Sequence, residues 1–154
     1  MPLVLSAYQG RYIMASCTNL NEFSVKTYWK PVIIKFECWE AYFVSSQPST
    51  AQIGQNLQIH GDAEPLAVIT YSLGSSGRLV NPQWVFDDSH MLKLNGTFTG
   101  GTLEIDINRQ SIYHNGQSVM ASLTLASRFP TILPGDYRFT GPSGGLITWY
   151  ERWL

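Results

Sequence analysis

Apolar and polar residues alternate with a period of two along most of this chain, and this pattern constrains its fold most. Successive side chains of a β-strand point to opposite faces, so a half-buried strand alternates in this way. The clearest case is Leu103–Ile107 followed by Ser111–His114, with the polar residues Asn108-Arg109-Gln110 between them. We predict a hairpin here, followed by a tight turn at Asn115-Gly116, a dipeptide that tolerates positive φ angles.

The same pattern recurs from Trp29 onward, with turn signals about every 8–12 residues, which is typical of a β-sandwich or barrel. The run from Leu146 to Trp153 predicts a long terminal strand. Its expected faces are Ile147, Trp149 and Trp153 on one side and Thr148, Tyr150 and Arg152 on the other. Connections this short favour antiparallel pairing. We therefore predict an all-β fold, an antiparallel two-sheet β-sandwich, and find no convincing helical segment.

Composition narrows the classes of function. The 154 residues suit one domain, and a net charge of -1 provides no basic field for nucleic acid. Only 14% of residues are charged, whereas 7 Phe, 5 Trp and 8 Tyr are present. Low charge with many aromatics suits a surface buried against other chains, although an ordinary aromatic-rich β protein has the same composition.

No apolar run approaches the length of a membrane span, and the first residues lack a basic leader, so we expect neither a span nor a secretory signal. Two cysteines, Cys17 and Cys38, are too few for a disulfide scaffold. Free thiols in a reducing compartment are the expectation, and a structural bridge stays open.

The first 30 residues differ from the rest, with only broken alternation from Phe23 to Trp29. We interpret residues 1–29 as an amino-terminal arm or incomplete unit, and residues 30–154 as the sandwich domain. Such an arm packs either on a neighbouring subunit or as a strand on the edge of the same sheet, and both alternatives stay open.

Residues with catalytic potential are scattered. His60, His90 and His114 lie in separate segments without metal-binding spacing. Asp87-Asp88 has oxygen ligands for a cation but reads as a turn. The candidates for an acid/base pair are Glu37, Glu40, Glu104 and Asp106, of which the last two fit the wet face of a strand. A glycoside hydrolase needs two carboxylates about 5–9.5 Å apart across a cleft. We expect no enzyme, no cofactor and no metal site.

Two further features have a functional and a structural interpretation. The loop Gly141–Gly145 is flexible enough to cradle a phosphate but leads into a strand instead of a helix. Aromatic rings stack on sugars, so the tryptophans are either a sugar-binding surface or core and interface residues: Trp39, Trp84, Trp149 and Trp153. A carbohydrate-binding module is therefore the alternative function.

Three stretches, taken in order, resemble a known family: His60–Tyr71, Gly101–Gly116 and Arg128–Gly135 with the terminus Trp149–Leu154. They are similar to the carboxy-terminal domain of the distal tail proteins of long, flexible-tailed bacteriophages. The resemblance covers about residues 30 to 154. Its motif and structural positions are Gly61, Asp62, Ala63, Pro65, Leu103, Ile105, Asp106, Asn115, Gly116, Pro130, Leu133, Pro134, Gly135, Trp149, Arg152 and Trp153.

The resemblance implies a galectin-like, jelly-roll-like β-sandwich and a structural role in the virion tail. It implies a tail-tip or baseplate component, made in the host cytoplasm, that connects tail tube and receptor-binding apparatus. Implied partners are tail tube, tail-associated and receptor-binding proteins in a homo-oligomer such as a hexamer, with neither nucleic acid nor membrane. The family's ring is built by an amino-terminal domain that this chain lacks at full size. The galectin sugar-binding residues have no counterpart at matching spacing.

Two residues carry specific expectations. Gly135 follows Pro134 and is expected to take a positive φ angle in a type II turn, so a valine there should cost more than about 1 kcal/mol. Arg152 is either a paired charge inside an assembly or a solvated arginine at the end of a strand.

Overall fold

The computed structural model describes residues 2–4, 7–18, 34–38 and 42–154. Within them the regular structure is β-strand except for one 3-10 turn, η2 (Met120–Ser122). The strands are β1 (Pro2–Leu3), β2 (Arg11–Cys17), β3 (Phe36–Cys38), β4 (Phe43–Ser45), β5 (Ser49–Gln52), β6 (Leu57–Ile59), β7 (Ala63–Val80), β8 (Gln83–Val85), β9 (Met91–Lys93), β10 (Thr97–Asp106), β11 (Ser111–His114), β12 (Gln117–Ser118), β13 (Gly135–Tyr137) and β14 (Gly145–Trp153). No helix in the described residues has the length and apolar character needed to span a membrane.

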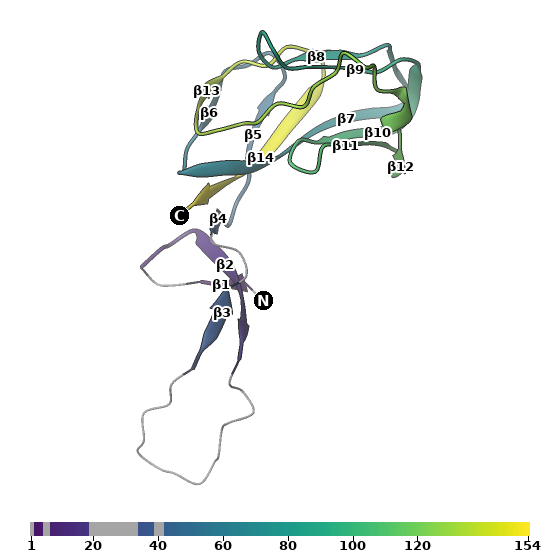
Figure 1. Ribbon diagram of the computed structural model, residues 1–154. Helices are drawn as coiled ribbons and strands as arrows, with labels where there is room; N and C mark the ends of the chain where they lie inside the picture. Colours follow the sequence, from purple (N-terminus) through teal and green to yellow (C-terminus); the bar gives the residue numbers. More distant parts are fainter. Residues whose placement is uncertain (1, 5–6, 19–33, 39–41) are drawn as a thin grey trace, which may run out of the picture.

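One large sheet forms the first layer of the molecule. Its order is β1-β2-β4-β14-β7-β10-β11-β12, with β5 also paired to β14 and β3 paired to β2. Two small sheets, β6–β13 and β8–β9, form the second layer over its central strands (Figure 1). All of these strand pairs are antiparallel, which confirms the predicted antiparallel two-sheet sandwich.

The hydrophobic core lies between the two layers. The main sheet contributes side chains of β7, β10, β11 and β14, and the second layer those of β6, β8 and β9 with the loops beside them. Because alternate residues of each strand point inward, the period-two pattern of the sequence becomes one continuous cluster. Its buried members are Leu57, Ile59, Ala67, Ile69, Tyr71, Trp84, Phe86, Leu92, Leu94, Phe98, Leu103, Ile105, Ile107, Ile112, Ile132, Phe139, Ile147 and Trp149.

The predicted hairpin is confirmed as β10–β11, with Leu103 opposite His114 and Asp106 opposite Ser111. The tight turn that follows is also confirmed, since Asn115 and Gly116 have φ angles of 51° and 75°. Asn115 then acts beyond its own turn. Its side-chain Oδ1 accepts a hydrogen bond of 2.8 Å from the backbone N–H of Thr102, in the neighbouring strand.

The predicted terminal strand is confirmed as β14, and the predicted inner face is confirmed for Ile147 and Trp149. Ile147 and Trp149 are buried in the core as expected. The pairing of β14 with β7 then shifts register between Tyr150 and Arg152. Because β7 advances three residues there while β14 advances two, the extra residue lies in β7. Trp153 lies outside the core cluster, and the face expected for it stays a prediction.

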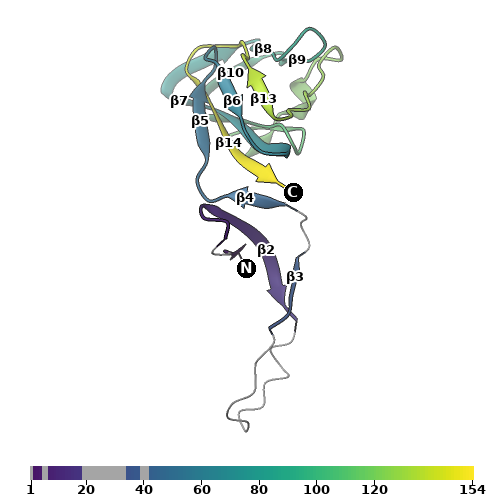
Figure 2. The ribbon, with the colours of Figure 1, turned by 90° about the vertical axis from the view of Figure 1, so that its left-hand side faces the viewer.

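The amino-terminal segment joins the main sheet and also extends beyond it. Arg11 and Tyr12 of β2 pair with β4, which in turn pairs with the end of β14. Farther along, β2 pairs with β1 at Ile13 and Met14 and then with β3 from Ala15 onward, and β2 and β3 project from the sandwich as an extension (Figure 2). The start of β2 is therefore a strand of the main sheet, as in the edge-strand alternative, whereas packing of an arm on a neighbouring subunit stays a prediction. The expected boundary near residue 30, and the alternation from Phe23 to Trp29, lie outside the described residues.

We call the part of β2 and β3 that pairs only with each other, Ala15–Cys17 and Phe36–Cys38, the extension. The two cysteines lie in it. Cys38 is opposite Ala15, and Cys17 is opposite Phe36 on the same strand pair. No disulfide joins the two thiols.

A buried polar pair crosses the core between the layers. The indole N–H of Trp84 donates to the Tyr71 hydroxyl at 2.8 Å, and this hydroxyl donates to the Pro142 carbonyl at 3.0 Å. The loop Gly141–Gly145 leads into β14, as expected, and closes over these two rings. Burial raises the pKa of Tyr71 to about 12, partly offset by the hydrogen bond from Trp84.

We predict that Gly101→Ala destabilises the protein by more than about 1 kcal/mol. Gly101 has a φ of 66°, and an added Cβ would overlap the Asn115 side-chain oxygen. Gly116→Ala is the matched control, because Gly116 has a φ of 75° with no atom near the added Cβ. Urea unfolding measures both. Equal losses in the two variants would show that the contact between Gly101 and Asn115 has no energetic weight.

We predict that stability falls as the pH rises from about 10 to about 12. The folded state holds the Tyr71 proton more tightly than the unfolded chain, so the stabilisation is full below the unfolded pKa and is lost through the folded one. Unfolding free energies across this range measure the effect, with Tyr71→Phe as the comparison. If Tyr71→Phe shows the same slope as the parent, Tyr71 does not cause it.

Candidate functional site

The histidines do not converge on a site. The backbone N–H of His60 donates to the Glu151 carboxylate at 3.2 Å, whereas His114 Nε2 lies 2.9 Å from the Gly100 carbonyl in the main sheet. His90 lies in the second layer, between β8 and β9. Among the described residues no group of three or more His, Cys, Asp or Glu side chains is placed to hold a metal ion.

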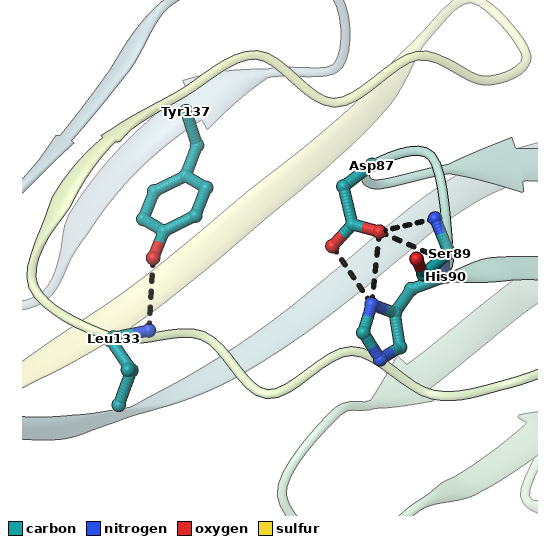
Figure 3. Close-up of polar contacts among 5 residues, drawn as sticks. All are labelled: Asp87, Ser89, His90, Leu133 and Tyr137. Atoms are coloured by element: carbon teal, nitrogen blue, oxygen red, sulfur yellow. Dashed lines mark hydrogen bonds and ion pairs between the residues drawn. The ribbon is translucent and has the colours of Figure 1, made fainter.

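The Asp87-Asp88 pair is a turn between β8 and β9, as its structural interpretation predicts. The Asp87 carboxylate accepts backbone N–H bonds from Ser89 at 2.7 Å and from His90 at 2.8 Å (Figure 3). It also lies 2.8 Å from His90 Nδ1. The bond from Ser89 is the largest cause that lowers the pKa of Asp87. With its oxygens engaged in the turn, Asp87 organises the backbone between the two strands.

The other acidic candidates are dispersed. Asp106 accepts the backbone N–H of Arg109 at 2.9 Å, and the Arg109 Nε lies 3.7 Å from it, so this carboxylate holds the hairpin turn. Glu104 is exposed on the outer face of β10, and Glu37 is exposed on β3 in the extension. Glu40 lies outside the described residues. The acidic candidates within the described residues therefore either hold a turn, as Asp106 does, or face solvent, as Glu104 and Glu37 do.

The first of the three stretches that carry the resemblance, His60–Tyr71, holds the start of β7 against the end of β14. The Asp62 N–H donates to the Arg152 carbonyl at 3.0 Å, and Ala63 is directly opposite Arg152. Gly61 has a φ of 104°, and a Cβ there would collide with the Arg152 carbonyl oxygen. Glycine and the following aspartate thus let two strands approach closely where the sheet turns toward the extension.

Asn108 completes this arrangement, although its place in the sequence predicts only a turn residue. Its Oδ1 accepts the Ala67 N–H at 2.8 Å. Its Nδ2 donates to the carbonyl of Pro65, which is buried, at 2.9 Å and to the Glu64 carboxylate at 3.1 Å. One amide side chain therefore connects the hairpin turn to the strand that begins at the first motif. An asparagine within three polar turn residues carries no sequence signal for such a long-range role.

The third stretch that carries the resemblance, Arg128–Gly135, runs along the second layer. Pro130 is buried, and the Leu133 N–H donates to the Tyr137 hydroxyl at 3.1 Å (Figure 3). Gly135 has a φ of 147°, positive as expected. This angle is far from the about +80° that a type II turn requires, and Gly135 begins β13. The expected type II turn is therefore wrong.

Aromatic and guanidinium side chains meet where the extension joins the sandwich. The Arg11 guanidinium lies 3.7 Å from the centre of the Trp153 ring, and that of Arg152 lies 3.9 Å from the centre of the Tyr42 ring. Tyr8 stacks on Phe43 with ring centres 4.8 Å apart. Cations attract the faces of aromatic rings. These contacts, which we call the junction, fasten β2 and the residues beside β4 to β14.

Arg152 is held within the chain by an aromatic ring and a carbonyl group. Its guanidinium is half-buried against the Tyr42 ring and donates to the Glu64 carbonyl at 3.4 Å. It makes no ion pair with a described residue. The half-buried side chain does not fit the solvated alternative, and the paired charge inside an assembly stays a prediction.

The tryptophans of the described region do not form an open surface. Trp84 and Trp149 are buried in the core, and Trp153 is covered by Arg11. Trp39 lies outside the described residues. For the three described tryptophans the structure therefore favours the interpretation as core and interface residues over a sugar-binding surface.

Comparisons with known proteins agree with the resemblance found in the sequence. Residues 61–153 match the family model described as "Siphovirus-type tail component, C-terminal domain". Among solved structures, the chain matches that of the SPP1 Dit (gp 19.1) protein with a TM-score of 0.78 and 16% identity. This match covers 99% of the chain and 64% of the SPP1 protein, so the chain spans less than two thirds of it. A search of curated proteins finds no match.

We predict that Asn108→Ala costs about 1–3 kcal/mol, because it leaves the Ala67 N–H and the Pro65 carbonyl without their partner. Arg109→Ala is the neighbouring control, since the Arg109 side chain is 84% exposed. Urea unfolding of both variants gives the free energies. A loss for Asn108→Ala no larger than that for Arg109→Ala would remove Asn108 from the structural role assigned to it.

Proposed function

Because the chain belongs to the family of siphovirus-type tail components, we propose that it connects tail tube and receptor-binding apparatus at the tail tip. It would do so as a non-enzymatic protein that binds other tail proteins. The observation that carries the proposal is the family match over residues 61–153, on a sandwich in which Asp87 and Asp106 hold turns. The place of such a protein is the tail of the virion.

The tail-tip position rests on likeness and is part of the proposal. The structure with the same fold is described as "a Paradigm of Hub Adsorption Apparatus in Gram-positive Infecting Phages", and this description belongs to the SPP1 protein. From the resemblance we further propose a homo-oligomer, with six copies as the expected number, made in the host cytoplasm. Residues 1–29 as an arm and 30–154 as the sandwich remain the proposed division.

The motif residues have a structural role in this proposal. Gly61, Asp62 and Ala63 place β7 against β14. Asp106 and Asn115 hold the turns at the two ends of β11. A rigid sandwich is a suitable connector, because a protein that joins two others must keep a fixed geometry between its contact surfaces.

The carbohydrate-binding alternative lacks a supporting observation. A sugar surface needs exposed aromatic rings grouped on one face, whereas Trp84 and Trp149 are buried and Trp153 lies under Arg11. We therefore propose no glycan partner.

The test is a phage from which the gene has been deleted, complemented with a tagged copy. We predict that the tagged chain is present in purified virions and that antibody labelling places it at the end of the tail away from the head. Without complementation, particles should lack receptor-binding proteins. A chain absent from purified particles, or one spread along the whole tail tube, would contradict the proposal.

A further inference from the structure

The outer face of the main sheet combines exposed apolar side chains on adjacent central strands. Along β7 and β14, the residues between the buried ones point away from the core. Tyr150 is directly opposite Leu66, Thr148 is opposite Val68, and Leu146 is opposite Thr70. We call the set Leu66, Val68, Leu146 and Tyr150 the open face. Leu66 and Tyr150 are direct cross-strand neighbours, whereas Val68 and Leu146 lie diagonal to each other with Thr148 and Thr70 as their direct partners, so the stripe is apolar with two uncharged threonines within it.

The open face is accessible to a partner. Leu66 is 39% exposed and Leu146 is 41% exposed, although both lie in the middle of a sheet whose other side is fully covered by the core. Val68 and Tyr150 are half-buried between them. Single exposed leucines are ordinary, but a stripe of apolar side chains on rigid central strands is typical of an interaction surface.

Charge defines one side of this surface. The next strand, β10, places Glu104 opposite Thr70, and β11 places Tyr113 opposite Glu104. Glu104 is exposed and makes no ion pair with a described residue, whereas the neighbouring Asp106 has Arg109 beside it. The surface therefore has an uncharged centre. Toward β10 and β11 it has the Glu104 carboxylate, which makes no ion pair with a described residue. A partner with a basic group at that side would match it.

We propose that the open face docks a different tail protein, one with an uncharged apolar patch opposite Leu66 and Leu146 and a lysine or arginine opposite Glu104. This inference rests on the proposed function, because it takes the protein to act inside a tail. The exposed members are aliphatic, and aliphatic side chains favour a protein surface over a sugar, which stacks on aromatic rings. The partner binds by burying the stripe and neutralising the carboxylate.

The first test uses the complemented deletion phage with the double variant Leu66→Glu and Leu146→Glu. We expect at least about a tenfold fall in the amount of this chain retained per purified particle, because two central apolar contacts are replaced by charges. Glu104→Lys should also lower retention, by a smaller factor. Leu125→Glu is the matched control, since Leu125 is a fully exposed leucine in a loop tied to β9 of the second layer. Far-UV circular dichroism and the thermal midpoint verify folding of each variant.

The second test does not depend on retention of a variant. A photo-crosslinking amino acid in place of Leu146, in assembled particles, should give a covalent product with a different tail protein, identified by mass spectrometry. Products only with other copies of this chain, or no product, would overturn the inference. So would equal losses for the Leu125→Glu control and the double variant, or glycan binding that the double variant abolishes.

The two proposals fail in different ways. If the unchanged chain is absent from particles, the proposed function fails. If the unchanged chain is present and the double variant is folded and retained normally, only the docking role of the open face fails.

Discussion

The structure depends on the backbone pairing of β7, the strand that has a neighbour on both sides at the centre of the main sheet. Ile69 is opposite Ile147 of β14 on one side and Ile105 of β10 on the other. All three side chains are fully buried, so the hydrogen-bonded centre of the sheet is also the centre of the core. The start of β7 is fixed by close contact at Gly61 and by the Asn108 side chain, which satisfies backbone groups near Pro65.

The sequence was informative where short-range pattern decides structure. The β10–β11 hairpin and the Asn115-Gly116 turn follow from alternation and from the φ angles that these two residues tolerate. Long-range effects could not be predicted in this way. The bulge in β7 opposite the step from Tyr150 to Arg152 depends on a partner far along the chain. The same is true of the hydrogen bond from Ala67 to Asn108 and of the pairing of β2 with the three-residue strand β4. The motif positions were found by resemblance, and their contacts became visible only in the fold.

The same framework that holds the core presents the surfaces. Buried residues of β7 and β14 face the second layer, and the residues between them form the open face on the other side of the same strands. At the end of β14, the junction carries the sheet into the extension through Arg11 on Trp153 and Arg152 on Tyr42. The main sheet therefore carries one side of the core, the open face and the extension.

Hydrogen–deuterium exchange of the isolated chain tests the central place of β7 most directly. Amides that open only with global unfolding exchange most slowly. Peptides that contain Ala67–Tyr71 and Leu103–Asp106 should be the slowest of the molecule, whereas β8 and β9 of the second layer, and the part of β2 paired only with β3, should exchange faster. Exchange of β8 and β9, or of the extension, as slow as that of Ala67–Tyr71 would contradict the account.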